Sequence, residues 1–79
     1  MPTVLRVRGY RFHFYANEGL EPPHIHVRSA DGTAKFWLVP IALTEWRRYD
    51  HRELNAIRAL VEEHREELLH AWDTYFSRS

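Results

Sequence analysis

The hydrophobic pattern of this 79-residue chain changes its period near residue 50, and that change constrains the fold more than any other feature. Before it, short runs alternate apolar and polar side chains and are separated by turn residues, as in half-buried strands. After it, apolar residues recur at steps of three and four, and neither glycine nor proline occurs from Asp50 to Ser79. The first part therefore predicts a sheet, and the second part predicts helix.

The first part contains five candidate strands. Asp31-Gly32 is a strong hairpin signal between the third and fourth of them, and Pro22-Pro23 keeps the chain before the third extended. The strands are predicted at residues 4–7, 10–16, 24–29, 34–39 and 41–46. The last of these is either a short edge strand or an extended connection, so we expect a small antiparallel sheet of three to five strands.

The second part opens with a helix start signal. Asp50 has the side chain of an N-cap, and Glu53 completes a capping box. A single helix of about 25 residues would be about 37 Å long, which exceeds the width of a small sheet. It therefore either breaks near His64 or projects and packs against a second copy of the chain. We predict one long C-terminal helix over about residues 50–77, packed on the sheet.

The fold class is thus α+β, in a single domain that spans residues 1–79 with its sheet in residues 4–46. Because alternate residues of a strand face opposite ways, the pattern divides the sheet into two faces. The helix-facing side is predicted to carry Tyr10, Phe12, Phe14, Ile25, Val27, Phe36 and Leu38. The other side is predicted to carry Arg11, His13, Tyr15, His24, His26, Arg28, Lys35 and Trp37.

The end of the helix carries a stripe of large apolar residues. Leu68, Trp72 and Tyr75 share one side of the helix. This stripe favours core packing, and the alternative is a contact with a partner or within a homodimer.

His24 and His26 form a His-x-His pair. They are alternate residues of one predicted strand, so their Cα atoms lie roughly 6.6 Å apart on the same face. Two imidazoles at that separation can share a divalent metal ion. Further ligands for such an ion are His13 and one of Glu18 and Glu21. The alternative interpretation is two polar strand residues that form hydrogen bonds or face water, with His26 stacked on Trp37.

The polar face also fits RNA chemistry. A metal-independent ribonuclease needs groups that titrate near neutral pH, cations for the phosphate and rings on which unpaired bases stack. The acid–base candidates are His13, His24 and His26. The nucleic-acid or anion-binding candidates are Arg11, Arg28, Lys35, Trp37 and Tyr15. The same face would suit a partner protein, so a non-enzymatic interaction module is the alternative.

Composition removes several classes of function. The chain has no cysteine, which excludes disulfides, zinc–thiolate sites and thiol catalysis. It has no glycine-rich phosphate loop and no nucleophile elbow. No apolar run approaches the roughly 18 residues of a membrane span, and no signal peptide is evident, so we expect a cytoplasmic protein that does not enter a membrane.

Charge is distributed unevenly along the chain. Residues 1–48 carry seven basic and four acidic residues, whereas residues 49–79 carry four basic and seven acidic ones. A basic first half either complements the acidic second half or presents a face to anions. Arg47-Arg48 is interpreted as a solvated loop pair.

Several runs of the sequence resemble the bacterial family catalogued as domain of unknown function 4160. They lie at residues 17–19, 21–27, 34–38 and 66–72, and they include a Pro-Pro-His-x-His motif at residues 22–26 and Trp72. The resemblance covers the chain from about Val4 to Phe76. It implies a small prokaryotic cytoplasmic protein, often encoded beside a small partner of another uncharacterised family (2442), and this pairing has suggested a toxin–antitoxin module. It carries over no catalytic residues.

The residues and the resemblance together lead to one functional prediction. We expect one half of a toxin–antitoxin-like pair that acts on or binds RNA through the polar sheet face, with a small cognate partner protein. The alternatives are the interaction module and a metal-binding protein that uses His24 and His26. Apart from that divalent metal, no cofactor is expected.

Overall fold

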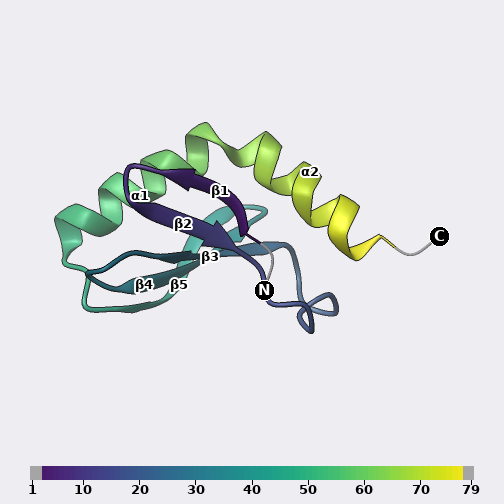
Figure 1. Cartoon of the computed structure of the whole chain (residues 1–79), viewed down its shortest axis with the longest axis horizontal. Coiled ribbons are helices and arrows are strands. Elements are labelled where there is room, and N and C mark those ends of the chain that lie inside the picture. The colour runs from purple at the N-terminus through teal and green to yellow at the C-terminus, as the bar shows by residue number, and fades with distance from the viewer. Residues whose placement is uncertain (1–2, 78–79) are drawn as a thin grey trace.

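The computed structural model describes residues 3–77 of the chain, which form one sheet and two helices (Figure 1). Five antiparallel strands lie in sequence order, so that each strand pairs with its neighbours along the chain. The elements are β1 (Thr3–Val7), β2 (Tyr10–His13), β3 (His24–Arg28), β4 (Thr33–Leu38), β5 (Ile41–Arg47), α1 (His51–Glu63) and α2 (Arg65–Phe76). The predicted α+β class is confirmed, and the fifth candidate is a true strand.

Short turns fix the first and third hairpins. Between β1 and β2, Arg8 and Gly9 have φ angles of 52° and 84°, and two positive angles in succession match the twist of a tight hairpin. Between β3 and β4, the Ser29 N–H donates to the Gly32 carbonyl at 3.0 Å, so the predicted hairpin is present and its chain turns at Ala30 and Asp31. β2 is shorter than predicted, because it ends at His13 and the chain then leaves the sheet.

The helix-facing side of the sheet holds the apolar core. Its six most buried predicted members are at most 1% exposed: Phe12, Phe14, Ile25, Val27, Phe36 and Leu38. Tyr10 is half-buried. From the helices, Ile57, Val61 and Leu68 are fully buried, and Trp72 is 5% exposed. Core packing of the Leu68 and Trp72 stripe is therefore confirmed, whereas Tyr75 is 41% exposed.

The N-terminus of α1 is capped as predicted. The Glu53 N–H donates to the Asp50 carboxylate at 2.9 Å, which satisfies one of the first free backbone donors of the helix. The Glu53 side chain accepts a hydrogen bond from the Tyr10 hydroxyl at 2.6 Å. This bond ties the first turn of α1 to β2.

The prediction of one long C-terminal helix is wrong, because the helix breaks near His64, which was the other option. α1 ends at Glu63, α2 begins at Arg65, and His64 between them has φ −104° and ψ 15°. Arg65 Nε donates to the Leu38 carbonyl at 3.2 Å, which holds the start of α2 against the end of β4. The break lets α2 turn and return its apolar side to the core.

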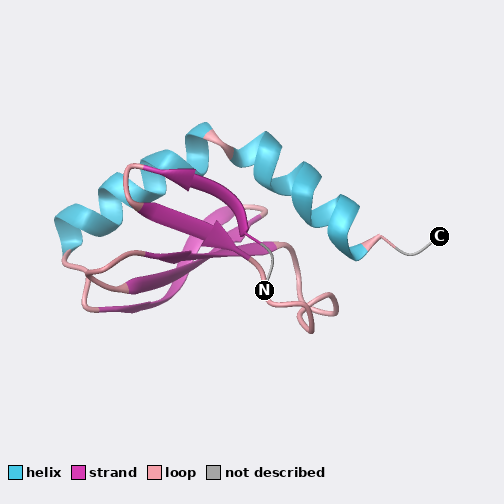
Figure 2. Ribbon diagram, in the orientation of Figure 1, coloured by secondary structure: helices cyan, strands magenta, loops and turns pink. Residues whose placement is uncertain are grey.

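α2 runs beyond the sheet and packs on the loop between β2 and β3 (Figure 2). The Phe14 ring at the start of this loop lies 5.3 Å from the Trp72 ring and 5.6 Å from the Phe76 ring. Gly19 also approaches Phe76, since a Cβ at residue 19 would lie 2.7 Å from the Phe76 ring. The loop of residues 14–23 is therefore held by the last turns of α2.

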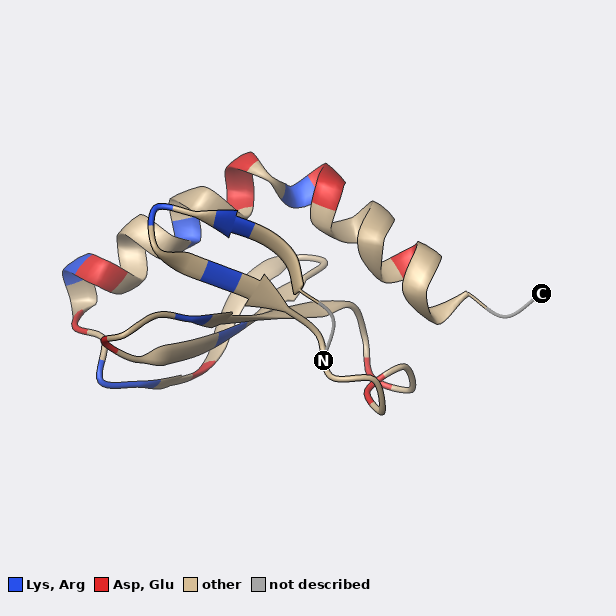
Figure 3. Cartoon of the chain, in the orientation of Figure 1, with Lys and Arg blue, Asp and Glu red and all other residues tan. Residues whose placement is uncertain are grey.

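Charge follows the two layers of the fold. Lys and Arg gather on the strands and their turns, whereas much of the acidic charge lies on the helices and on the loop of residues 14–23 (Figure 3). Neither described helix has the length and apolar character that a membrane crossing requires. The side of the sheet away from the helices, called the outer face below, is consequently rich in cationic side chains.

Candidate functional site

A row of polar side chains crosses the outer face. His13 of β2 lies opposite His26 of β3, His26 lies opposite Lys35 of β4, and Lys35 lies opposite Glu45 of β5. Residues directly opposite in antiparallel strands project from the same face and contact each other. The alternation in the sequence therefore placed three of these four residues on a common surface.

The other members of the predicted polar set flank this row. Arg11 pairs with Arg28 on one side, and His24 pairs with Trp37 on the other. Tyr15 lies beyond the end of β2, yet its ring centroid is 4.6 Å from that of His26. All eight predicted residues are thus gathered, although three of the face are buried: His13, His24 and Lys35.

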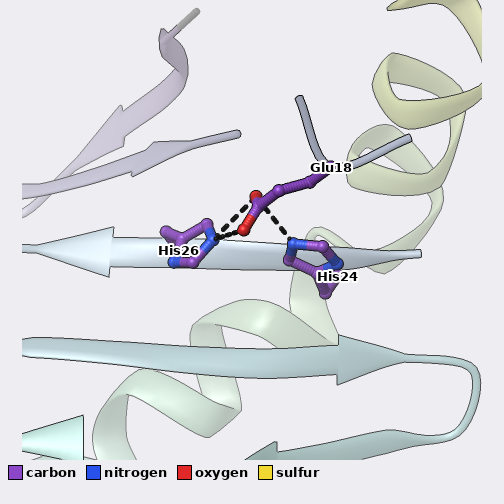
Figure 4. Close-up of side chains that lie close together, drawn as sticks. All are labelled: Glu18, His24 and His26. Atoms are coloured by element: carbon purple, nitrogen blue, oxygen red, sulfur yellow. Dashed lines mark hydrogen bonds and ion pairs between the residues drawn. The ribbon is translucent and has the colours of Figure 1, made fainter. Parts of the chain in front are cut away.

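The carboxylate of Glu18 joins the two histidines of β3 (Figure 4). Its Oε1 lies 2.8 Å from His24 Nε2 and 2.9 Å from His26 Nε2, and its Oε2 lies 3.1 Å from His26 Nε2. The other ring nitrogen of His24, Nδ1, donates to the Pro22 carbonyl at 2.9 Å. These bonds fasten the loop of residues 14–23 onto the outer face.

Burial and hydrogen bonding oppose each other in this cluster. Burial raises the pKa of Glu18, but the interactions with His24 and His26 together outweigh it, so the pKa of Glu18 is lowered. The pKa of His26 is lowered, because burial and the nearby His24 and Lys35 together outweigh the opposing effect of the Glu18 carboxylate. At neutral pH, Glu18 is therefore ionised and His26 is a neutral ring that donates its Nε2–H to the carboxylate.

His13 is buried without any hydrogen-bond partner for its ring. It is 2% exposed and stacks on His26, with ring centroids 5.5 Å apart. Both ring nitrogens lack a partner. Burial, together with the charges of His26 and Arg11, lowers the pKa of His13 to about 4. His13 is consequently a neutral imidazole at neutral pH and lacks the imidazolium proton that a general acid would donate.

Lys35 is occupied within the fold. Its Nζ donates to the Glu21 carboxylate at 3.0 Å and lies 4.8 Å from the centre of the Trp37 ring. Trp37 meets His24 edge to face, with centroids 5.7 Å apart. The predicted stacking of His26 on Trp37 is therefore replaced by a contact with His24, because residues 24 and 37 are opposite in the register.

A groove of about 750 Å³ lies next to the polar row. It is lined by His13, Tyr15, His26, Val27, Arg28, Thr33, Ala34, Lys35, Glu45, Trp46 and Arg47. Three of these side chains are cationic and one is acidic, so the groove has a net positive lining. Its volume lies within the range of sites that take small ligands. Arg11, His24 and Trp37 from the predicted site do not line it.

The cluster around Glu18 is also the place where a metal could bind. Among residues 3–77, it is the one group of three or more such side chains whose ligand atoms all converge, with Glu18, His24 and His26 offering atoms within 4.8 Å of one another. His13 does not join that group. His26 belongs both to the cluster and to the groove lining.

The comparisons with known proteins agree with the resemblance in the sequence. Residues 9–73 match the family model described as domain of unknown function, DUF4160. The chain belongs to this family. No curated protein and no solved structure matches it.

In this DUF4160 protein, sequence reasoning left some site residues out. Of the two acids predicted as oxygen ligands, Glu18 forms hydrogen bonds with both histidines, whereas Glu21 pairs with Lys35 and lies 3.9 Å from His24 Nδ1. Arg47 and Trp46 line the groove, although Arg47 had been assigned to a solvated loop. The sequence feature that could have predicted the position of Arg47 is the run of residues 41–47, in which apolar and polar residues are mixed and which forms a strand of seven residues.

Proposed function

We propose that this protein binds single-stranded RNA in the groove on the outer face. The observation that carries the proposal is the composition of the groove, where cations and rings line one space of about 750 Å³. Cations bind phosphates, and exposed rings stack on unpaired bases. Helical RNA would not fit, because its bases are already stacked and paired.

The cations differ in how available they are. Arg28 and Arg47 are exposed, whereas the Lys35 ammonium is already paired with Glu21. Guanidinium groups bind phosphate with two parallel hydrogen bonds. We therefore assign phosphate binding to Arg28 and Arg47, and a weaker electrostatic role to Lys35. Arg11 contributes positive charge from beside the groove.

The two rings lie at different places: Tyr15 packs against the acid–base candidates His13 and His26, whereas Trp46 lines the groove from the edge strand β5. Tyr15 is 38% exposed and Trp46 is 53% exposed, so both present surface on which a base can stack. His26 is the acid–base candidate that is shared by the groove and the Glu18 cluster. Chemistry on bound RNA would therefore take place beside His26, with His24 holding Glu18 in position and His13 supporting the His26 ring.

The biological setting is proposed from the family resemblance. The protein would act in the cytoplasm as one half of a toxin–antitoxin-like pair, with RNA as its target and a small cognate protein as its regulator. Expression of the chain alone in a bacterium should then arrest growth, and co-expression of the cognate partner should relieve the arrest. A homodimer is the other assembly that we predict, through the exposed end of α2.

The binding test uses a short fluorescein-labelled single-stranded RNA and fluorescence anisotropy at several salt concentrations. Affinity should fall with salt, with a slope of about −0.7 per phosphate contact on logarithmic axes. Arg28→Ala and Arg47→Ala should each weaken binding by about threefold to tenfold, because each removes one phosphate contact. Arg52→Ala is the matched control, since Arg52 is exposed on α1, away from the groove.

The second candidate function is docking of a partner protein on the same face. The half-exposed Trp46 and the exposed Arg28 are the residue types that dominate binding energy at protein interfaces. If the wild type does not bind RNA even at low salt, or if Arg52→Ala weakens binding as much as Arg47→Ala, RNA binding is refuted. In that case the purified cognate partner should bind the wild type and lose affinity for Trp46→Ala.

A further inference from the structure

Both ring nitrogens of His24 face oxygen atoms that accept hydrogen bonds, but a neutral histidine ring carries only one proton. A carbonyl oxygen only accepts, so the 2.9 Å contact with Pro22 requires a proton on Nδ1. Nε2 faces a carboxylate oxygen at 2.8 Å, which also only accepts when ionised. A neutral His24 with one proton would therefore point a lone pair at a negative oxygen. Either a second proton or another cation has to lie between them.

A metal ion at this position would replace that second proton. A histidine that ligates metal through Nε2 usually donates its Nδ1–H to a backbone carbonyl or carboxylate, which fixes the tautomer and orients the ring. The bond from His24 to Pro22 is such a support, and it comes from the residue two positions earlier in the same segment. His24 is 0% exposed, so its orientation is also fixed by packing between the Trp37 and Trp72 rings.

The remaining ligands suit zinc in number and kind. Two imidazole nitrogens and one carboxylate form one of the three-ligand sets that hold zinc with an open fourth position. Ligand atoms about 2.0–2.1 Å from a tetrahedral ion lie about 3.3 Å apart. The Glu18 oxygen, 2.8 and 2.9 Å from the two ring nitrogens, therefore has to withdraw by a few tenths of an ångström. The two ring nitrogens, which lie within 4.8 Å of each other, have to reach the same separation by rotation of the less buried His26 ring. Glu18 lies on a loop, which can make that shift while the two histidines stay on β3.

Water can reach the open position. The side chains of Glu18 and His26 are 15% and 17% exposed, whereas His24 closes the site from the side of the core. We propose that Glu18, His24 and His26 bind one Zn²⁺ ion, with water as the fourth ligand. The proposal does not depend on RNA binding in the groove, although the ion would lie beside the groove because His26 belongs to both.

The competing explanation is that the cluster only fastens the loop of residues 14–23 to the sheet. Glu18→Gln separates the two, because its amide oxygen can still accept from the histidines while the negative charge that zinc needs is lost. His26→Gln is the second variant, since His26 is the more exposed ligand and its replacement leaves the packing of His24 intact. His70→Ala is the matched control, because His70 is exposed on α2, away from the cluster.

The experiment is calorimetric titration of tag-free, chelator-treated protein with zinc chloride, repeated with cobalt and visible spectroscopy. The wild type should bind one zinc ion with micromolar or tighter affinity and should show the intense ligand-field bands of tetrahedral cobalt. Glu18→Gln and His26→Gln should lose at least about 100-fold in affinity, since even supporting residues around a metal cost 10- to 100-fold. Circular dichroism would verify that both variants remain folded.

Two results would overturn the proposal. The first is a wild type that binds zinc no more tightly than folded Glu18→Gln, and the second is binding that His70→Ala weakens as much as His26→Gln does. A wild type that binds zinc but not RNA would refute the proposed RNA binding in the groove and leave the metal site standing. A wild type that binds RNA but not zinc would refute the metal site and leave RNA binding standing.

Discussion

Phe12 and His13 are consecutive residues of β2, and they are 0% and 2% exposed on opposite faces of the sheet. Phe12 belongs to an apolar core that needs no hydrogen bonds. His13 is enclosed by the rings of Tyr15 and His26, and neither of its nitrogens has a partner. Burial of the Phe12 ring therefore stabilises the fold. Burial of the His13 ring costs free energy, because its polar nitrogens have no hydrogen-bond partner.

The largest effect should come from the helix-facing side. Phe36→Ala should lower the free energy of unfolding by about 3–5 kcal/mol, because the 1% exposed ring would leave a cavity in the core. Urea denaturation followed by circular dichroism measures this. Leu20→Ala is the control, since Leu20 is fully exposed, and it should change stability by less than about 0.5 kcal/mol. A loss of under about 1 kcal/mol in Phe36→Ala would contradict the assignment of this face as the core.

On the outer face, His24→Phe should lower stability by about 2–4 kcal/mol in metal-free buffer. The variant keeps a ring between the two tryptophans, but it leaves the Pro22 carbonyl without its donor and leaves the Glu18 carboxylate with His26 as its one remaining histidine partner. The same denaturation experiment measures it, with His70→Phe on the exposed side of α2 as the control. A His24→Phe variant as stable as the wild type would show that these hydrogen bonds contribute nothing.

His13→Phe should instead raise the free energy of unfolding, and the size of this effect should depend on pH. The pKa of His13 is about 4 in the folded chain and near 6.5 in the unfolded chain, so between these values the unfolded chain binds the extra proton. Stability from this residue is therefore present above about pH 6.5 and is lost as pH falls toward 4. The loss should be about 2 kcal/mol at pH 5.

His13→Phe should remove that loss and should stabilise the protein by about 1 kcal/mol at neutral pH, where it also removes two unpaired polar atoms. Denaturation of both proteins at pH 7 and pH 5, with chelator present, gives the two differences. His26 has a lowered pKa of the same sign, so His13→Phe should retain some sensitivity to acid. Equal pH dependence in the two proteins would refute the account of His13.

The smallest effect on stability should come from the groove. Arg47→Ala should change the free energy of unfolding by less than about 0.5 kcal/mol, because Arg47 is exposed and lies at the end of the edge strand. Its urea midpoint should match that of the wild type while its affinity for RNA falls. A loss of stability above about 1 kcal/mol would mean that Arg47 supports the fold instead of a ligand.

Both faces of the central strands could be predicted from the sequence, because a period of two leaves only one choice once one face is apolar. Phe12, Ile25 and Phe36 occupy one side as expected, and His13 and His26 occupy the other. Only the degree of burial differed, since alternation shows which way a side chain points and not what covers it.

The rest of the site depends on contacts that no local pattern records. Glu18 lies on a loop without periodicity, and its position is set by hydrogen bonds to β3. The break at His64 was one of two options from helix length, but the segment contains neither glycine nor proline, so the sequence did not decide between a break and a projecting helix. Arg47 reaches the groove after the register between β4 and β5 shifts next to Lys35, and such a bulge changes the parity that a sequence pattern assumes.

The packing of Phe76 on Gly19 has a consequence for how the protein is made. Residues of the Glu18 cluster leave the ribosome early, but the helix turn that encloses their loop leaves it late, after all five strands. Translation products that stop within the break at His64 contain every ligand and every strand, yet they lack the wall that Trp72 and Phe76 provide. The site is therefore complete only after α2 has been synthesised.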